Sequence, residues 1–163
     1  GDDDTGDDDT GDDDDEETAV SDCLPDPSCT PCGSDAYESN NTCQVATDMG
    51  SGLFMGDGSV TICPSCDEDW FERTIAADST YALLLSFDRS EGDLRAQLYD
   101  SQVPPNLLAE SVADGVGGAA LVHTATATET LRLRVFIPPE QDLNGDAGNA
   151  YSIVVADTEI ALP

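Results

Sequence analysis

Positive charge is almost missing from this sequence. It has no lysine, and its 5 basic residues are all arginines, against 35 aspartates and glutamates, for a formal net charge of −30. Such a chain repels phosphate backbones and anionic membrane surfaces. No stretch approaches the roughly 18 consecutive apolar residues that a membrane-spanning helix needs. The sequence therefore argues against nucleic-acid binding and membrane insertion, and it favours cations or cationic partners.

Residues that carry common catalytic chemistry are also scarce. The one histidine, His123, sits in an alternating run of alanine and threonine that is typical of an ordinary strand, and no G-x-S-x-G nucleophile motif occurs. The glycines at 115, 117 and 118 are not followed by a predicted helix, as a dinucleotide-binding loop would be. Acidic residues are abundant, but no pair is set apart by an apolar pocket that would separate their pKa values. We therefore predict that the protein is not an enzyme.

All six cysteines lie in the first 66 residues: Cys23, Cys29, Cys32, Cys43, Cys63 and Cys66. An even number favours disulfide bonds and an oxidising compartment. Together with a first residue that is Gly1 and not methionine, this indicates a mature product that is secreted or displayed on the cell surface. Two alternatives stay open, because two pairs, 29/32 and 63/66, have the C-x-x-C spacing of zinc and redox sites. Among the disulfides, a bridge from Cys43 to Cys63 is favoured, since it would tie the lead-in to the first strands.

The N-terminal part divides into two segments that precede the folded domain. Residues 1–17 repeat GDDDT-GDDDT-GDDDD and end in two glutamates, so they hold 12 carboxylates and no apolar side chain. Such a segment cannot bury enough surface to offset the entropy of ordering it, which predicts a disordered or extended acidic linker. Residues 18–48 are predicted to form an irregular cysteine-rich lead-in, and residues 49–163 a single domain.

From about residue 50 onward, short apolar runs recur between turn signals, and helical periodicity is nearly absent. This pattern predicts an all-β fold, an antiparallel, jelly-roll-like β-sandwich of about eight strands. In 131–137, leucine, valine and isoleucine alternate with Arg132 and Arg134, which are expected to pair with carboxylates on the outer face. Trp70 and Phe71 are expected in the core. The predicted strands are 59–62, 70–75, 81–87, 94–99, 107–112, 119–124, 131–137 and 151–156.

Four short motifs follow one another in an order that resembles a known family. They are Asp35-Ala-Tyr-Glu38 with Asn41-Thr42 and Ala46, then Asp67-Glu-Asp69-Trp-Phe71, then Gly92-Asp93-Leu94 with Leu98-Tyr99-Asp100, and finally Asn149-Ala-Tyr151-Ser-Ile153-Val-Val155. From about residue 34 to 156 the chain resembles the bacterial pre-peptidase C-terminal domain, a β-sandwich appended to secreted peptidases and to many surface proteins. The resemblance implies a jelly-roll-like sandwich, with relatives that bind collagen or are stabilised by calcium. Arg95 departs from the family's usual Gly-Asp-Leu-Asp, which removes an expected oxygen ligand at that turn.

One loop has the composition of a calcium site. Asp142, Asn144, Asp146 and Asn149 place oxygen-bearing side chains around glycines, which lets a loop wrap a calcium ion. The glutamate that closes an EF-hand loop is absent, because Ile153 stands at that position. A calcium-stabilised loop and a plain turn before the last strand both remain open, and no cofactor other than Ca²⁺ is expected.

These features predict a noncatalytic module, secreted or at the cell surface, that is tethered by the acidic linker. It would bind or stabilise an extracellular protein or a polysaccharide. The contact surface is expected on the loops near Asp93, Asp100 and 142–149, because loops on a rigid sandwich commonly carry recognition. The alternative is a self-associating subunit of an extracellular filament or surface layer, assembled with or without the help of calcium.

Overall fold

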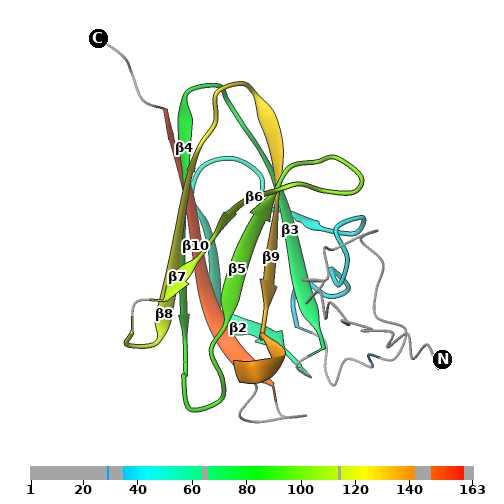
Figure 1. Cartoon of the computed structure of the whole chain (residues 1–163), viewed down its shortest axis with the longest axis vertical. Coiled ribbons are helices and arrows are strands. Elements are labelled where there is room, and N and C mark those ends of the chain that lie inside the picture. Colours follow the sequence, from blue (N-terminus) through cyan, green and yellow to red (C-terminus); the bar gives the residue numbers. More distant parts are fainter. Residues whose placement is uncertain (1–28, 30–34, 64–65, 114, 142–147, 160–163) are drawn as a thin grey trace, which may run out of the picture.

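Two β-sheets packed face to face make up the part of the chain that the structure describes. The computed structural model describes residue 29 and residues 35–63, 66–113, 115–141 and 148–159 (Figure 1). The acidic repeat 1–17 and most of the lead-in lie outside these residues. Within them, no helix has the length and apolar character needed to cross a membrane. The predicted all-β sandwich is confirmed.

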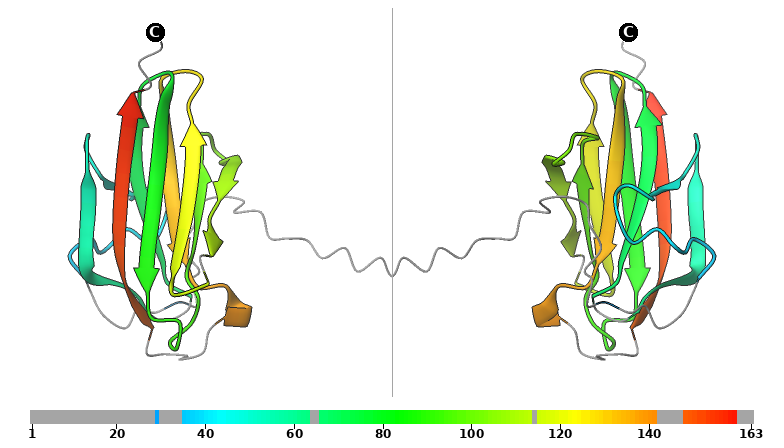
Figure 2. Two further views of the ribbon diagram at one scale, coloured as in Figure 1. Left: turned by 90° about the vertical axis from the view of Figure 1, so that its left-hand side faces the viewer. Right: turned by 90° about the vertical axis from the view of Figure 1, so that its right-hand side faces the viewer.

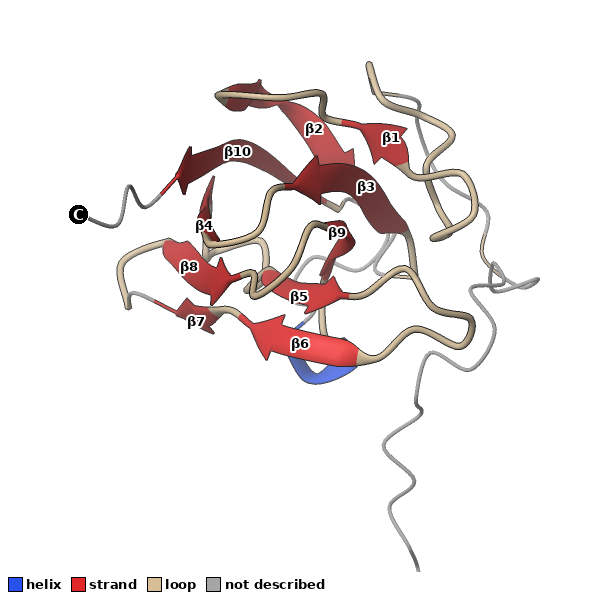
Figure 3. Ribbon diagram, turned by 90° about the horizontal axis from the view of Figure 1, so that it is seen from above, coloured by secondary structure: helices blue, strands red, loops and turns tan. Residues whose placement is uncertain are grey.

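Each sheet has five strands, and Figure 3 shows them as two layers seen from above. The first sheet runs in the order β1 (Thr47–Asp48), β3 (Glu68–Ile75), β9 (Glu129–Phe136), β5 (Arg95–Tyr99) and β6 (Leu107–Glu110). The second runs β2 (Phe54–Ile62), β10 (Asn149–Glu159), β4 (Ser79–Phe87), β8 (Gly118–Thr124) and β7 (Val112–Ala113). All neighbours are antiparallel except β1 and β3, and a 3-10 helix, Pro139–Gln141, follows β9.

Each of the eight predicted strands overlaps an observed one, but the predicted strand 107–112 is divided between the two sheets. Its first part is β6, which pairs with β5, and its last residue begins β7, which pairs with β8. Ser111 forms the corner between them. Its backbone N–H donates to the carbonyl oxygen of Ala96 at 2.8 Å, and its hydroxyl accepts from the N–H of Ala96 at 2.9 Å. These bonds satisfy the backbone where the chain crosses from one sheet to the other.

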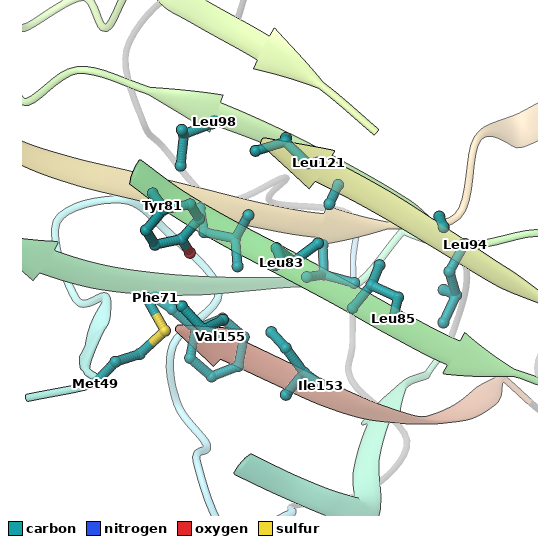
Figure 4. Close-up of a cluster of buried hydrophobic side chains, with 14 of the residues drawn as sticks. Met49, Phe71, Tyr81, Leu83, Leu85, Leu94, Leu98, Leu121, Ile153 and Val155 are labelled. Atoms are coloured by element: carbon teal, nitrogen blue, oxygen red, sulfur yellow. The ribbon is translucent and has the colours of Figure 1, made fainter. Parts of the chain in front are cut away.

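The core lies between the sheets and follows directly from the alternation along the strands. In β4, Tyr81, Leu83 and Leu85 point inward and are buried, whereas Ala82 and Leu84 point outward and are exposed. Figure 4 shows these inward side chains meeting Phe71 and Leu98 of the first sheet and Ile153 and Val155 of β10. Burial of such side chains contributes roughly 1.5–3 kcal/mol each, so this cluster is the main source of stability.

Trp70 is buried in the core, as expected, but in a second, smaller cluster and not in the one between the sheets. Neighbouring residues in a strand point to opposite faces, so Phe71 enters the main core and Trp70 lies on the outer face of the first sheet. There it packs against Cys43 and Tyr99, with ring centroids of Trp70 and Tyr99 5.6 Å apart. The segment 35–48 covers it, and the backbone N–H of Trp70 donates to the carbonyl oxygen of Asn40 at 2.8 Å.

The pair Leu84 and Leu85 tests this assignment of inner and outer faces. Leu85 is 0% exposed and Leu84 is 48% exposed. Leu85→Ala should lower the free energy of unfolding by about 2–5 kcal/mol, because it leaves a cavity in the core. Leu84→Ala should lower it by less than about 1 kcal/mol. Urea denaturation followed by the fluorescence of Trp70 measures both, and equal losses would contradict the assignment.

Candidate functional site

Four carboxylates gather where the segment 35–48 meets the start of β3. They are Asp35 and Glu38 of the segment and Asp67 and Asp69 at the beginning of the strand, and together they are called the acidic cluster below. They lie close enough that charge repulsion within the cluster helps to raise the pKa values of Glu38, Asp67 and Asp69. Asp67 is 2% exposed and Asp69 is 0% exposed, although ionised carboxylates are rarely buried without a cationic partner.

Local hydrogen bonds hold the first members of the cluster in place. One oxygen of Asp35 accepts from the N–H of Tyr37 at 2.7 Å, and the other accepts from the N–H of Thr61 in β2 at 2.8 Å. Asp67 accepts from the N–H of Cys63 at 3.1 Å and from that of Glu68 at 3.0 Å. Asp35 therefore ties the lead-in to the second sheet, and Asp67 closes the turn between β2 and β3.

Asp69 is the most deeply placed member of the acidic cluster. Alternation along β3 points it inward, where the hydroxyl of Tyr151 on β10 donates to its Oδ2 at 2.6 Å. Burial raises the pKa of Asp69 well above its ordinary value, and the nearby charges of Asp35, Asp67 and Glu38 raise it further against the opposing effect of the Tyr151 bond. Burial also raises the pKa of Tyr151, so its hydroxyl stays protonated as the donor.

Burial is likewise the largest cause of the raised pKa values of Glu38 and Asp67. For Glu38, burial together with the charges of Asp67 and Asp35 raises the pKa from 4.5 to about 7. For Asp67, burial raises the pKa even though the backbone N–H groups of Cys63 and Glu68 stabilise its charged form. The cluster thus holds its negative charge at a cost that a proton or a cation would relieve.

Several buried oxygens at this junction have no hydrogen-bond donor within the described part of the chain. They are Oδ1 of Asp69 and the side-chain carbonyl oxygens of Asn40 and Asn41. Asn40 belongs to the same junction, because its side-chain amide donates to the carbonyl oxygen of Trp70, the residue that follows Asp69, at 3.3 Å. Among the described residues, no group of three or more His, Cys, Asp or Glu side chains is arranged around a common point for a metal ion. The acidic cluster therefore offers oxygen ligands that do not converge on one position in this conformation.

The loop proposed from the sequence as a calcium site is described only at its end. Asp142, Asn144 and Asp146 lie outside the described residues, so that site stays a prediction. Asn149 is buried at the start of β10, and its amide nitrogen donates to the carbonyl oxygens of Asp88 at 3.0 Å and Gly92 at 2.7 Å. Asn149 therefore holds the β4–β5 loop.

Asp93 and Asp100, the other predicted contact residues, lie beyond opposite ends of β5. Both Asp93 carboxylate oxygens accept from the guanidinium of Arg89 at 2.7 Å. Asp100 accepts from the backbone N–H of Asn106 at 2.9 Å and from its side-chain amide at 2.7 Å. Each aspartate thus shapes its own loop.

One disulfide bond is described, and it joins Cys29 to Cys66. It therefore links the two C-x-x-C motifs to each other, which leaves a four-thiolate zinc site without two of its ligands. Cys43 and Cys63 are also disulfide-bonded. The bridge between those two residues remains a prediction.

Comparison with known proteins identifies the fold. No protein-family model matches the chain, and no curated protein matches it in sequence. Among solved structures, the pre-peptidase C-terminal domain of a collagenase from Bacillus anthracis is similar, with 14% identity over 69% of this chain and 94% of that chain and a TM-score of 0.50. A periplasmic inhibitor of g-type lysozyme from Aeromonas hydrophila is 12% identical over 69% of this chain and 97% of its own, with a TM-score of 0.52. The chain has the fold of the pre-peptidase C-terminal domain.

Within this pre-peptidase C-terminal fold, the outer face of the first sheet carries charge pairs as the sequence predicts. Arg132 contacts Glu72 at 3.1 Å, and Arg134 contacts Glu68 on the same neighbouring strand. Arg134 also lies over the ring of Phe136, 4.1 Å from its centroid. These arginines hold β9 to β3 and are neutralised by their partners.

Sequence reasoning did not assign a role to the acidic cluster. Its members were visible as parts of two motifs, Asp35 to Glu38 and Asp67 to Asp69, that carry the resemblance to the pre-peptidase C-terminal domain. Two short acidic motifs in a strongly acidic chain are a weak signal, because nothing local shows that they meet. The fold brings them together and adds Tyr151, which is 82 residues from Asp69.

Glu38 makes the stability of the protein depend on pH in a direction that can be tested. The pKa of Glu38 is about 7 in the folded protein and near its ordinary 4.5 in the unfolded chain. Its contribution to stability is therefore full below pH 4.5 and is lost as the pH rises through 7. In a chelator, the melting temperature should rise by a few degrees between pH 8 and pH 5.5.

Glu38→Gln should raise the melting temperature at pH 8 and flatten this dependence, because the variant has no carboxyl group to ionise. Glu91→Gln, in the β4–β5 loop, is the matched control and should retain the slope of the parent protein. If the parent protein and Glu38→Gln have the same pH profile in differential scanning calorimetry, Glu38 is not the responsible group.

Proposed function

We propose that this chain is a noncatalytic module that works outside the cell, and that its acidic cluster binds a calcium ion. The observation that carries the proposal is the burial of Asp67 and Asp69 beside Asp35 and Glu38, with one oxygen of Asp69 lacking a donor. In a buried site of this kind, a bound cation would offset the cost of the carboxylate charges.

The donor set fits calcium better than other cations. Every candidate ligand is a carboxylate or amide oxygen, and hard cations prefer such oxygens over the nitrogen and sulfur ligands that zinc takes. Calcium also accepts irregular geometry and about 6 to 8 ligands, so carboxylates that do not yet converge can close on it by side-chain rotation. Asp69, Asp67 and Glu38 would hold the ion, and Asp35, which is hydrogen-bonded to Thr61, would contribute a further oxygen ligand.

An ion bound there would fasten three parts of the molecule together. Glu38 and Asp35 come from the segment 35–48, Asp69 lies in β3 and Asp67 directly precedes it, and Asp35 is bonded to β2. The ion would supply positive charge only, and the residues would supply the geometry. Its effect would be to fix the lead-in, which carries the tether, onto the rigid sandwich.

The module character and the location outside the cell rest on separate support. The two similar structures are a domain of a collagenase and a periplasmic inhibitor, and each has the same sandwich fold. The Cys29–Cys66 disulfide fits an oxidising compartment. A strongly negative chain outside the cell would meet an extracellular protein or a polysaccharide as its partner, and calcium in the millimolar range is available there to load a weak site.

Calcium should stabilise the protein at neutral and alkaline pH. Adding about 2 mM Ca²⁺ in place of chelator at pH 8 should raise the melting temperature, because a ligand that binds only the folded state stabilises it by mass action. The gain should shrink at pH 5.5, where protons occupy the same carboxylates. Asp69→Asn should abolish most of the gain, since it removes a charged ligand while its amide oxygen can still accept from Tyr151.

Two further variants make the result specific. Glu91→Gln should keep the full rise in melting temperature with calcium, because Glu91 lies outside the acidic cluster. Asp146→Asn tests the loop predicted from the sequence: if it abolishes the gain and Asp69→Asn does not, calcium binds at that loop and not at the cluster. If calcium does not raise the melting temperature of the parent protein or of any variant, calcium binding is refuted.

A further inference from the structure

One surface of the sandwich has no charged side chain, although the chain carries a net charge of −30. It is the outer face of β10, β4 and β8, the three central strands of the second sheet, together with Met55 of β2 and Val112 of β7. Figure 2, on the left, shows these strands side by side with no described element lying over them. This uncharged face consists of Met55, Thr80, Ala82, Leu84, Ser86, Val112, Ala120, Val122, Thr124, Ser152, Val154 and Ala156.

Register places the larger apolar residues of the uncharged face in one continuous row. Val154 lies beside Met55 on one side and Leu84 on the other, Leu84 lies beside Ala120, and Ala120 lies beside Val112. Met55 is 63% exposed, Leu84 48% and Val112 74%. A second row, Ala156, Ala82 and Val122, runs parallel to it. The result is a flat apolar surface of small and medium side chains.

The outer face of the first sheet shows that this lack of charge is not a general property of the protein. That face carries Glu68, Glu72, Arg132 and Arg134 in two cross-strand pairs, and Arg95 reaches both Glu110 and Glu140. On the second sheet, the nearest charged position in register is Asp57, opposite Ser152 on the edge strand β2. This acidic position therefore belongs to the edge strand and not to the three central strands of the uncharged face.

We infer that the uncharged face is a docking surface for a second copy of this chain. Two copies of so negative a molecule repel each other wherever carboxylates would meet, and this face is the place where they can touch without bringing like charges together. A cationic partner would find no charge here to pair with, and a polysaccharide would find no aromatic ring to stack on. A second copy brings the same flat apolar surface, which a two-fold axis makes self-complementary.

The size of the face sets the strength of the contact. Four strands about 4.8 Å apart and about eight residues long, at 3.3 Å per residue, cover roughly 500 Å². Stable interfaces bury about 800 Å² per partner, so this one belongs to the weak class. We expect stacked sheets about 10 Å apart and a dissociation constant in the range of about 10–100 μM. Because the two faces close on each other, assembly stops at the dimer.

Sedimentation equilibrium of the full chain in chelator tests the inference. Between about 5 and 500 μM at 0.15 M salt, the weight-average mass should rise from 17.1 kDa toward twice that value. Raising the salt to about 0.5 M should strengthen association, since salt screens the repulsion between the charged rims and leaves apolar burial intact. A mass that stays at the monomer throughout would overturn the inference, and so would a mass that passes the dimer.

A matched pair of variants locates the contact. Leu84 in the uncharged face is 48% exposed, and Leu107 on β6 of the first sheet is 49% exposed. Leu84→Glu should weaken dimerisation by about tenfold or more, because it buries an unpaired carboxylate in the interface. Leu107→Glu introduces the same charge elsewhere and should leave the dissociation constant of the dimer within about twofold of the parent value. Circular dichroism checks that both variants fold. Equal weakening by the two variants, or none by Leu84→Glu, would overturn the assignment of the face.

Discussion

Two polar contacts, one buried and one partly buried, join β3 of the first sheet to β10 of the second, and the alignment of the sandwich depends on them. The Tyr151 hydroxyl meets Asp69 at 2.6 Å, and the Arg73 guanidinium meets Asp157 at 2.7 Å. Apolar burial has no direction, so the core alone would tolerate a sliding of one sheet over the other. A buried donor or acceptor left unpaired costs about 1–3 kcal/mol, and a buried charge costs more. The two contacts therefore specify one alignment of the two sheets.

The first of these contacts also couples the fold to the acidic cluster. Asp69 serves the sandwich as the acceptor for Tyr151 and serves the cluster as its most buried charge. The fold can therefore keep Asp69 buried only by meeting the cost of its charge, and the neighbouring carboxylates increase that cost. Neutralisation of the cluster, whether by protons or by a cation, thereby lowers the cost of keeping Asp69 buried between the sheets. A cation bound at the edge of the sandwich, as proposed above, would therefore act on the stability of the whole domain.

Sequence patterns predicted the strands well because alternation is local information. The run 131–137 shows which residues face inward without reference to any partner, and it matches β9. Local pattern could not show that Trp70 would be buried on the outer face, because the covering segment 35–48 begins more than 20 residues earlier. It could not show that the predicted strand 107–112 is divided at Ser111, because the local pattern is the same on both sides of Ser111 and only the partner strands differ. The acidic cluster and the Cys29–Cys66 bridge, with a separation of 37 residues, depend on the same long-range information.

The distribution of charge over the sandwich follows from how each sheet is used. On the first sheet, oppositely charged side chains pair across β3 and β9, so charge there contributes to strand pairing. On the three central strands of the second sheet, small apolar and hydroxyl side chains such as Ala82 and Thr80 occupy the outward positions, so these strands pair without charge on that face. At physiological salt the field of an exposed charge decays over about 8 Å. The uncharged face is roughly 20 Å across, so a charge at one border is largely screened over much of the face. A chain with a large net charge can thus keep one surface free of charge. Such a surface arises when the outward positions that alternate with the buried ones along these strands are all uncharged.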